Sequence, residues 1–467
     1  MGRETPQGGG RGGRIAGVVA VVVALVAALS AVLAGPGIVR AFGAGGGQST
    51  AWQAGKPPEA PLAVLPAMDT QAPMPAEAAL AAALGPLLAV PALGPHITAS
   101  VVDVATGQVL YSSEPDAAMT PASTTKVVTA AAALGARGPA YRITTRVVQG
   151  AQPGEVVIIG AGDPTLGVFP TAYYPGAPRL DALAAQVKEA LGGTPPTRVI
   201  YDQSVYTGPG VGPAWDDDSI TNGSGAVITA LMTEGGRTKP EKYSGRYPQP
   251  DVQAAQQFAR LLGLPNSAIA AGTAPQGAKE LGKVESPPMV RMVEFMLQES
   301  DNVLADALAR QVAIAKGQPA SFEGGAAAMK MVLEELNLPV TGYGLVDGSG
   351  FSRNDRLSPA LLTSILAMAA RADHADLRGI FSGLPVAGYS GTLASRYVKA
   401  QEGAAAAGLV RAKTGTLTGV NSLTGIVVDA DGRTLAFAFM ADQTTNGNQA
   451  VIALDRVAAA LAACGCR

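Results

Sequence analysis

The sequence predicts an α+β fold in which one antiparallel sheet is built from both ends of the folded region and covered by helices. Two strand patterns lie early in this region, at 97–104 and 108–111, and three lie near its end, at 409–416, 422–428 and 434–440. Much of the sequence between them has helical periodicity. Strands so far apart in the chain can share a sheet only if the chain returns to its start.

The N-terminal residues predict export. Residues 15–34 carry no charge and are long enough to span a bilayer. Three arginines precede them, Arg3, Arg11 and Arg14. Because positive charge is retained on the cytoplasmic side, we expect a cytoplasmic tail at 1–14, a transmembrane anchor at 15–34 and a cell-membrane protein with its remaining residues outside the cytoplasm. A cleaved signal segment, with secretion to the cell wall, is the alternative, but such signals usually have a shorter apolar core.

Residues 35–92 are rich in glycine, proline and alanine, and we expect a linker with one short helix at 76–88. Folded sequence is expected from about residue 93. At the other end, Asp431-Gly432 predicts a hairpin turn and 450–463 a helix. The last four residues, 464–467, contain both cysteines and are expected to form a frayed tail without function. The alternative is that Cys464 and Cys466 oxidise to a disulfide outside the cell, although so close a pair would be strained.

Composition excludes several classes of function. The formal net charge of the 467 residues is −2, and no basic cluster is interleaved with aromatic residues, so we expect no nucleic-acid partner. Two histidines, His96 and His374, and two cysteines are too few for a metal site rich in these ligands, so no metal or other cofactor is expected. A Ser-His-Asp triad is disfavoured for the same reason, which makes a lysine the more attractive base for a serine nucleophile.

The first candidate motif is Ser123, three residues before Lys126. Thr120 and Pro121 are a favourable N-cap and first-turn pair, so a helix is predicted from there to Gly135. Residues three apart share a helix face, so a neutral Lys126 could act as base to the Ser123 hydroxyl. The free N–H groups of the first turn suit an oxyanion. An ordinary capped helix with a solvated lysine is the alternative.

The second motif is Ser300-Asp301-Asn302, which interrupts two apolar helix faces. A turn there would place Ser300 and Asn302 in a cleft, where a hydroxyl can relay a proton and an amide can hold a carbonyl group. A helix cap is the alternative. The segment Ser352-Arg353-Asn354 also matches Ser-x-Asn, so this pattern alone does not discriminate.

The third motif is Lys413-Thr414-Gly415-Thr416 at the end of a strand pattern. A strand edge can pair with an extended peptide. Lys413 would raise the positive potential near a carboxylate, Thr414 and Thr416 offer hydroxyls, and Gly415 would let a ligand approach the backbone. An ordinary hairpin edge with a solvated lysine is the alternative.

Together and in this order, the three motifs resemble the signature of penicillin-binding proteins and serine β-lactamases. The chain most resembles the class C low-molecular-mass penicillin-binding proteins, which are D-alanyl-D-alanine carboxypeptidases and endopeptidases with an inserted domain. Four other stretches are similar to that family: 160–166, 347–353, 384–388 and 391–393.

The resemblance implies a fold and a domain organisation. A five-stranded antiparallel sheet covered by helices, with a helical subdomain, would form the catalytic domain. This domain would be split into 93–145 and 286–463 by an inserted domain of mixed or mainly β structure at 146–285.

The resemblance also implies roles in hydrolysing peptidoglycan stem peptides. Ser123 would attack the carbonyl between the two terminal D-alanines, and Lys126 would take its proton. Ser300 would pass a proton to the leaving D-alanine, and Asn302 would position the peptide. β-Lactam antibiotics would be covalent inhibitors at Ser123. Carboxypeptidase and endopeptidase activities are not separated by these motifs.

Substrate binding would fall to the third motif. Lys413, Thr414 and Thr416 would hold the terminal carboxylate, and the backbone N–H groups of Ser123 and Thr416 would form the oxyanion hole. Asp163 and Arg353 lie in family-like loops and are expected to face the cleft, where they would suit a diaminopimelate side chain. A structural role for both is the alternative.

Two other functions remain open from the residues. Some serine β-lactamases use a Glu-x-x-Leu-Asn segment, but the residue in the glutamate position before Leu336-Asn337 is Leu333. A non-catalytic cell-wall scaffold on the same fold is the other alternative, although none of the three motifs is damaged.

Overall fold

The computed structural model describes residues 71–398, 401 and 403–465, which belong to one compact unit spanning 66–467. The expected tail and anchor at 1–34 and most of the expected linker therefore lie outside the described residues. Within the described ranges, no helix is long and apolar enough to cross a membrane.

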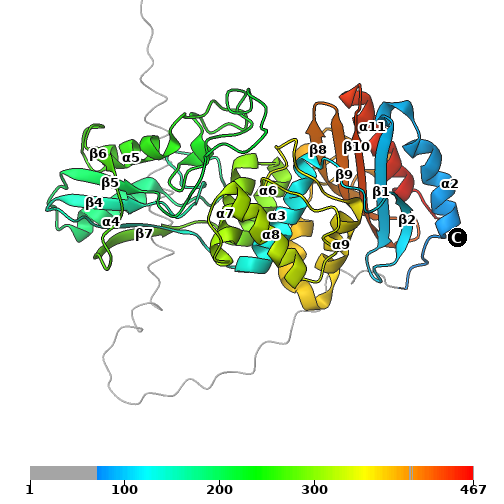
Figure 1. Ribbon diagram of the computed structural model, residues 1–467, viewed down its shortest axis with the longest axis horizontal. Helices are drawn as coiled ribbons and strands as arrows, with labels where there is room; N and C mark the ends of the chain where they lie inside the picture. Colours follow the sequence, from blue (N-terminus) through cyan, green and yellow to red (C-terminus); the bar gives the residue numbers. More distant parts are fainter. Residues whose placement is uncertain (1–70, 399–400, 402, 466–467) are drawn as a thin grey trace, which may run out of the picture. The chain divides into compact units, whose positions relative to one another are not determined.

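The first sheet is antiparallel, and its strands come from the two ends of this unit, as the sequence predicts. Figure 1 shows β1 beside β10, so the start and the end of the unit are joined at the centre of the sheet. The strand order is β2-β1-β10-β9-β8. The strands are β1 His96–Asp103, β2 Val109–Ser113, β8 Val410–Leu417, β9 Val420–Val428 and β10 Thr434–Asp442.

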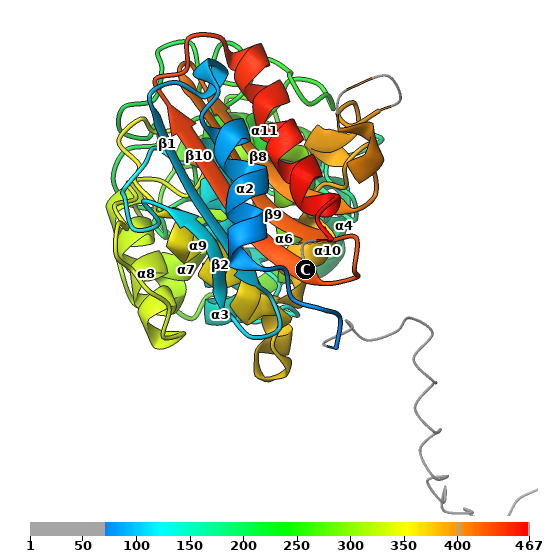
Figure 2. The same cartoon turned by 90° about the vertical axis from the view of Figure 1, so that its right-hand side faces the viewer.

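Strand β10 is buried on both faces because its side chains alternate between two hydrophobic cores. Its odd-numbered side chains from Leu435 to Ala441 enter a core shared with α2 (Glu77–Leu88) and α11 (Gly447–Ala462), which cover one face in Figure 2. Its even-numbered side chains from Ala436 to Met440 enter a core that includes α3 and α9. Helix α2 confirms the short helix predicted at 76–88.

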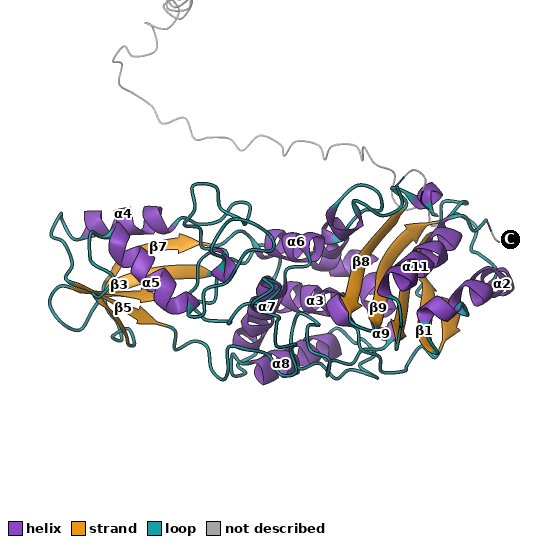
Figure 3. Cartoon of the chain, turned by 90° about the horizontal axis from the view of Figure 1, so that it is seen from above, coloured by secondary structure: helices purple, strands orange, loops and turns teal. Residues whose placement is uncertain are grey.

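A helical layer covers the second face of this sheet. Helix α3 contacts α6, α7, α8 and α9, and α9 packs directly on β1 and β10. Figure 3 shows α3, α6, α7 and α8 between the two sheets of the unit. The helices of this layer are α3 Thr125–Arg137, α6 Met289–Glu299, α7 Asn302–Ala315, α8 Phe322–Glu335, α9 Pro359–Ala370 and α10 Gly379–Gly383.

The second sheet is formed by residues of the segment that interrupts the first one. Its order is β6-β5-β4-β3-β7, with β4, β5 and β6 parallel and the other pairs antiparallel. Helices α4 (Leu180–Ala190) and α5 (Pro250–Leu261) share its hydrophobic core. The strands are β3 Thr144–Gln149, β4 Glu155–Ile159, β5 Arg198–Asp202, β6 Ile269–Ala271 and β7 Glu280–Glu285. We call residues 144–285 the insertion.

Two local predictions are wrong. Helix α3 does not end at Gly135 but continues to Arg137, and Gly138, with φ of 77°, is the residue that leaves the helix. Gly135 stays helical because α8 packs against it: a Cβ there would lie 3.0 Å from Val332. The C-terminal tail is not frayed at Cys464, which is 5% exposed and disulfide-bonded.

Candidate active site

Ser123 lies in a 3-10 turn, Ala122–Thr124, that leads into α3. The predicted helix start at Thr120-Pro121 is wrong, because Ala122 has a left-handed backbone with φ of 48° and the α-helix begins only at Thr125. The Thr124 hydroxyl donates to the Pro121 carbonyl at 2.7 Å, which holds the turn. Ser123 therefore lies in the turn two residues before the first residue of α3.

Two glycines make room for this turn. A Cβ on Gly350 would lie 1.8 Å from the Ala122 carbonyl oxygen. A Cβ on Gly415 would lie 2.0 Å from Ser422 Oγ and 2.7 Å from the Pro121 carbonyl oxygen. Gly415 therefore lets strand β8 approach the turn that carries Ser123, a role that the sequence did not predict; that it also admits a ligand stays a prediction.

Lys126 lies beneath Ser123 with no exposed surface. Its Nζ donates to Ser123 Oγ at 3.0 Å, to Asn302 Oδ1 at 2.6 Å and to the Ser349 carbonyl at 2.6 Å. Burial lowers the pKa of Lys126 to about 8, although nearby carboxylates, Asp306 first, act in the opposite direction. A neutral amine at this position can take the proton of the Ser123 hydroxyl.

The Ser300-Asp301-Asn302 turn joins α6 to α7. Ser300 has φ of 57°, and the Asp301 side chain caps α7 by accepting from the Leu304 N–H at 2.9 Å. These conformations send the Ser300 and Asn302 side chains toward Ser123, where both line the same pocket. Ser352 of the rival Ser-x-Asn segment is buried instead and donates to the Pro213 carbonyl at 2.6 Å.

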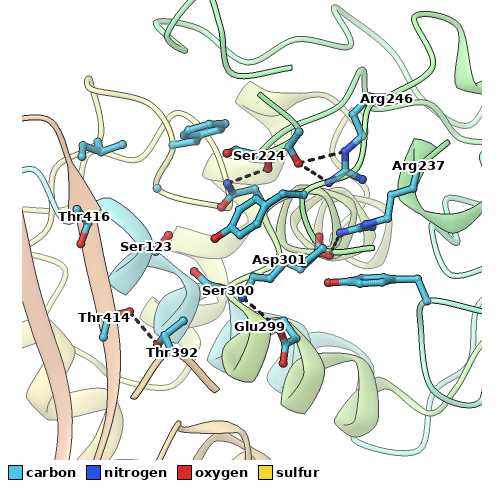
Figure 4. A pocket seen from close by; sticks show the side chains of 18 residues that line it. Ser123, Ser224, Arg237, Arg246, Glu299, Ser300, Asp301, Thr392, Thr414 and Thr416 are labelled. Atoms are coloured by element: carbon cyan, nitrogen blue, oxygen red, sulfur yellow. Dashed lines mark hydrogen bonds and ion pairs between the residues drawn. The ribbon is translucent and has the colours of Figure 1, made fainter. Parts of the chain in front are cut away.

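Lys413 is buried under the pocket, where its Nζ donates to Ser300 Oγ and to the Thr414 carbonyl, both at 2.8 Å. Burial and then the charge of Lys126 hold the pKa of Lys413 well below its usual range. Lys413 therefore contacts the second motif and does not line the pocket itself. Thr414 and Thr416 do line it, and Thr414 donates to Thr392 Oγ1 at 2.9 Å (Figure 4).

Strand β8 lies at an edge of the first sheet. Residues 385–387 cover the beginning of this edge, because the Ala387 N–H donates to the Val410 carbonyl and the Ala412 N–H to the Pro385 carbonyl. In the described part of the chain, no strand pairs with the edge from Lys413 to Leu417 on its outer side. An extended peptide can pair there.

The insertion supplies the opposite wall of the pocket, which has a volume of about 240 Å³. The side chains of this wall were not predicted from the sequence: Tyr173, Arg237, Lys242, Tyr243 and Arg246. Three cationic residues within ten positions were the available signal. Their proximity to Ser123 could not be predicted, because it depends on contacts between segments far apart in the sequence.

Within the described residues, no cluster of His, Cys, Asp or Glu could hold a metal ion.

Arg237 and Asp301 form a buried ion pair in this wall. Arg237 Nη2 lies 2.8 Å from Asp301 Oδ2, and both side chains are 2% exposed. The guanidinium also stacks on the Tyr173 ring, 3.7 Å from its centroid, and donates to the Tyr174 hydroxyl at 2.9 Å. The insertion is thus bonded to the middle residue of the second motif.

The structure does not bring Asp163 and Arg353 together in the cleft, and neither lines the pocket. Asp163 is 2% exposed; its Oδ1 accepts from the Thr165 N–H and hydroxyl, and its Oδ2 has no partner. Burial raises the pKa of Asp163 to about 6. Arg353 forms a bidentate pair with Asp216 at 2.9 and 3.1 Å and donates to the Thr418 carbonyl.

Comparison with known proteins identifies related sequences over most of the chain. The model of a family described as "D-Ala-D-Ala carboxypeptidase 3 (S13) family" matches residues 80–261 and 237–461. Carboxypeptidase Rv3627c of Mycobacterium tuberculosis is 40% identical over 418 residues, covering 88% of this chain and 89% of that protein. Carboxypeptidase DacB of Mycolicibacterium smegmatis is 40% identical over 405 residues, covering 85% and 87%.

Solved structures show the same fold. Penicillin binding protein 4 (dacB) from Haemophilus influenzae superposes with a TM-score of 0.66 at 21% identity, over 82% of this chain and 98% of that one. The same protein complexed with a β-lactam gives a TM-score of 0.57 at 22% identity, over 81% and 97%.

Proposed function

Since the chain belongs to the D-Ala-D-Ala carboxypeptidase 3 (S13) family, we propose that it is a serine D-alanyl-D-alanine carboxypeptidase acting on peptidoglycan stem peptides through Ser123. One observation supports this assignment most directly. The Nζ of the fully buried Lys126, whose pKa is lowered to about 8, lies 3.0 Å from the Ser123 hydroxyl. Ser123 lines a pocket to which residues of all three motifs contribute. Ser123 and Lys126 are a nucleophile with its base.

Acylation begins when Ser123 Oγ attacks the carbonyl carbon between the two terminal D-alanines and Lys126 Nζ takes the hydroxyl proton. The backbone N–H groups of Ser123 and Thr416 stabilise the resulting oxyanion, and one such donor is typically worth about 10² to 10³ in rate. The C–N bond then breaks. Ser300, which accepts a hydrogen bond from Lys413, donates its proton to the amine of the leaving D-alanine. The proton that Lys126 took from Ser123 then replaces it on Ser300, so Lys126 is neutral again for deacylation.

Deacylation uses water. A water molecule attacks the ester carbonyl and transfers a proton back through Lys126, which restores the Ser123 hydroxyl and releases the shortened peptide as a carboxylate. Asn302 holds the peptide, and the hydroxyls of Thr414 and Thr416 bind the terminal carboxylate of the substrate. Both threonines line the pocket, and Lys413 lies beneath it, where its Nζ donates to Ser300 Oγ.

β-Lactams mimic the terminal dipeptide, and we propose that they acylate Ser123 by the same attack. The test is covalent labelling of the purified protein with a fluorescent penicillin, together with D-alanine release from a D-Ala-D-Ala peptide. Ser123→Ala should abolish both signals, and an unchanged melting temperature would show that the variant is folded.

Labelling that survives in Ser123→Ala would contradict the nucleophile assignment. Fast release of hydrolysed drug would favour a β-lactamase instead. The structure does not support that reading, because Leu333 is buried within α8 and the nearby Glu335 is paired with Lys316. Labelling without D-alanine release, but with cleavage of cross-linked peptides, would assign endopeptidase activity.

We also propose that residues 15–34 anchor the protein in the cell membrane, with the catalytic unit outside the cytoplasm. The uncharged 20-residue stretch and the arginines before it support this localisation.

A further inference from the structure

A second cavity lies at the carboxyl ends of two parallel strands of the insertion. Its volume is about 520 Å³, and none of the described residues that line it also lines the active-site pocket. Tyr201 near the end of β5, Ala271 at the end of β6 and the following Thr273 are among its lining residues. Ligand-binding crevices of open α/β sheets lie outside the carboxyl ends of the strands. We call this cavity the insertion groove.

The lining of the insertion groove offers many hydrogen-bonding groups and almost no charge. Among the described residues that line it, Arg310 alone is charged. Within the described part of the chain, the side-chain hydroxyls of Tyr201, Ser204, Thr207 and Thr273 form no hydrogen bond, so all four are available to a ligand. Such a surface suits a neutral, polar ligand better than a lipid or a highly charged polymer.

Arg310 lines the groove from α7 and is only 1% exposed. Its Nη1 donates to the Thr207 and Ala320 carbonyls, and its Nη2 donates to the Pro209 carbonyl at 2.9 Å. The Nε is buried and has no partner among the described residues. A guanidinium has five N–H groups, so two remain, on the adjacent Nε and Nη2. An unpartnered buried donor is costly, and an acceptor oxygen of a ligand would satisfy it.

Aromatic rings give the groove a second kind of contact. Tyr201 is half-buried at its side, and the Tyr206 ring is held by the Arg310 guanidinium, which lies 4.9 Å from the ring centroid. The face of an aromatic ring is electron-rich, so it attracts the slightly positive C–H groups on the face of a sugar ring. The hydroxyl and amide groups at the edge of the sugar would meet the free hydroxyls and the spare N–H groups. This combination fits an amino-sugar polymer.

The groove lies close to the active-site pocket along one segment of the insertion. Ser224 lines the pocket and Val227 lines the groove. Three residues of extended chain span at most about 11 Å. In Figure 4, Ser224 and the threonines of the third motif lie on opposite sides of Ser123. If the threonines hold the terminal carboxylate, the groove lies toward the amino-terminal end of the stem peptide, by which the peptide is attached to its glycan strand.

We propose that the insertion groove is an exosite that binds the glycan strand of peptidoglycan while a stem peptide attached to that strand enters the active-site pocket. This inference rests on the proposed function and names the polymer that presents the substrate. Because the glycan and the peptide are covalently joined, binding in the groove raises the effective concentration of the stem peptide at Ser123.

The test compares two substrates with the same D-Ala-D-Ala stem peptide, one as the free peptide and one with the peptide attached to a soluble, uncross-linked glycan strand. For the full-length protein, the KM per stem peptide should be lower by about tenfold or more for the attached peptide, because of its effective concentration. The value of kcat should be the same for both, since the groove does not contact the reacting atoms. Glycan strands stripped of their stem peptides should bind to the protein and inhibit only the reaction of the attached substrate.

Two variants alter the groove in different ways. Tyr201→Ala removes the aromatic contact, and Ala271→Trp fills the groove from its exposed rim. Both should raise the KM of the attached substrate to that of the free peptide and leave the reaction of the free peptide unchanged. Tyr111→Ala is the matched control, because Tyr111 is also a half-buried strand tyrosine but lies on β2 in the first sheet, outside the groove.

Four results would overturn the exosite: equal KM values for the two substrates in the wild type, a KM difference that survives in both groove variants, its loss in Tyr111→Ala, or no binding of stripped glycan. The first and the last need no variant, so poor folding of a variant does not decide the outcome. Failure of the proposed function would look different, because neither substrate would release D-alanine and penicillin would not label Ser123, while stripped glycan would still bind.

Discussion

At the scale of single residues, burial lowers the pKa of Lys126 and so allows its amine to be neutral. An exposed lysine with a pKa near 10.4 would be almost fully protonated at neutral pH and could not accept the serine proton. The same side chain without exposed surface has its pKa lowered to about 8. The residue keeps three hydrogen-bond acceptors around its Nζ, which fix its direction toward Ser123.

We therefore expect the second-order rate constant for acylation by a β-lactam to rise with pH through a midpoint near 8. Below this pH Lys126 is protonated and cannot act as base, and above it the neutral form predominates. Stopped-flow acylation between pH 5 and 10 would measure the curve. A rate that is already constant from pH 6 upward would assign the base to another group.

Asp163 is a residue where ionisation opposes folding. Its carboxyl is buried with one unpartnered oxygen, and its pKa is raised to about 6. Below about pH 4 the group is protonated in both the folded and unfolded states. As pH rises toward 6 the unfolded chain releases the proton first, so stability falls, by about 3 kcal/mol in all for a difference of about two in pKa.

Asp163→Asn should consequently stabilise the protein at pH 7.5, where this cost is fully present, and have little effect at pH 4. Urea unfolding at the two pH values would measure both. The hypothesis that Asp163 binds a substrate side chain makes a different forecast, namely altered peptide preference with no pH-dependent change in stability.

Sequence reasoning at this scale succeeded where the geometry is local. The spacing of Ser123 and Lys126 predicts their approach, and they are in contact. The contact forms although Ser123 lies in the 3-10 turn before α3, because residues three apart also lie on one side of a 3-10 turn. The packing role of Gly415 was missed, because its missing Cβ faces Ser422, which is paired with it only through the sheet register. Arg246 was missed for the same reason: its position depends on the packing of the insertion.

At the scale of elements, the α6–α7 turn is fastened to the insertion by Arg237. Helix α6 is followed by a left-handed C-cap residue, Ser300, and α7 is preceded by the Asp301 cap, so the orientation of the Ser300 and Asn302 side chains depends on one short turn. Arg237 binds the capping residue itself. Burial would raise the pKa of Asp301, but Arg237 and Arg246 hold it below its usual value.

Arg237→Gln should lower the free energy of unfolding by about 3 to 5 kcal/mol, because it leaves the buried Asp301 carboxylate uncompensated. The double variant Arg237→Gln/Asp301→Asn should recover part of the loss. Lys242→Gln is a control that breaks the half-exposed pair with Glu299 and should cost less than about 1 kcal/mol. Strictly additive losses in the double variant would show that Arg237 and Asp301 are not coupled.

Secondary-structure elements were predicted correctly where the signal lies within the segment, and incorrectly where it depends on contacts with another segment. Strand alternation and the Asp431-Gly432 turn predict β9 and β10 well, because both signals lie within the segments themselves. The end of α3 was misplaced at Gly135, since glycine there serves a close contact with α8 and not a helix stop. No local signal distinguishes these two uses of glycine.

At the scale of the whole molecule, the chain is expected to be a membrane-bound enzyme with an exported catalytic unit. The full-length protein should stay with the membrane fraction after a high-salt wash, because residues 15–34 carry no charge. Deleting residues 1–35 should release it into the soluble fraction. An N-terminus near Gly45 in the native protein, determined by Edman sequencing, would instead identify 15–34 as a cleaved signal.

The pairing of β1 with β10 also determines when the enzyme becomes active during its synthesis. The register joins His96 to Asp442, so the centre of the first sheet cannot close until nearly the whole chain has been made. Closing so long a loop is entropically costly, and contacts of this range slow folding. The strands that pair in the insertion, such as β3 and β7, are closer in the sequence than β1 and β10, and the insertion has a hydrophobic core of its own. We expect it to fold first, leaving Ser123 without its final neighbour β8 until the last strands arrive, which delays hydrolytic competence until the chain is complete.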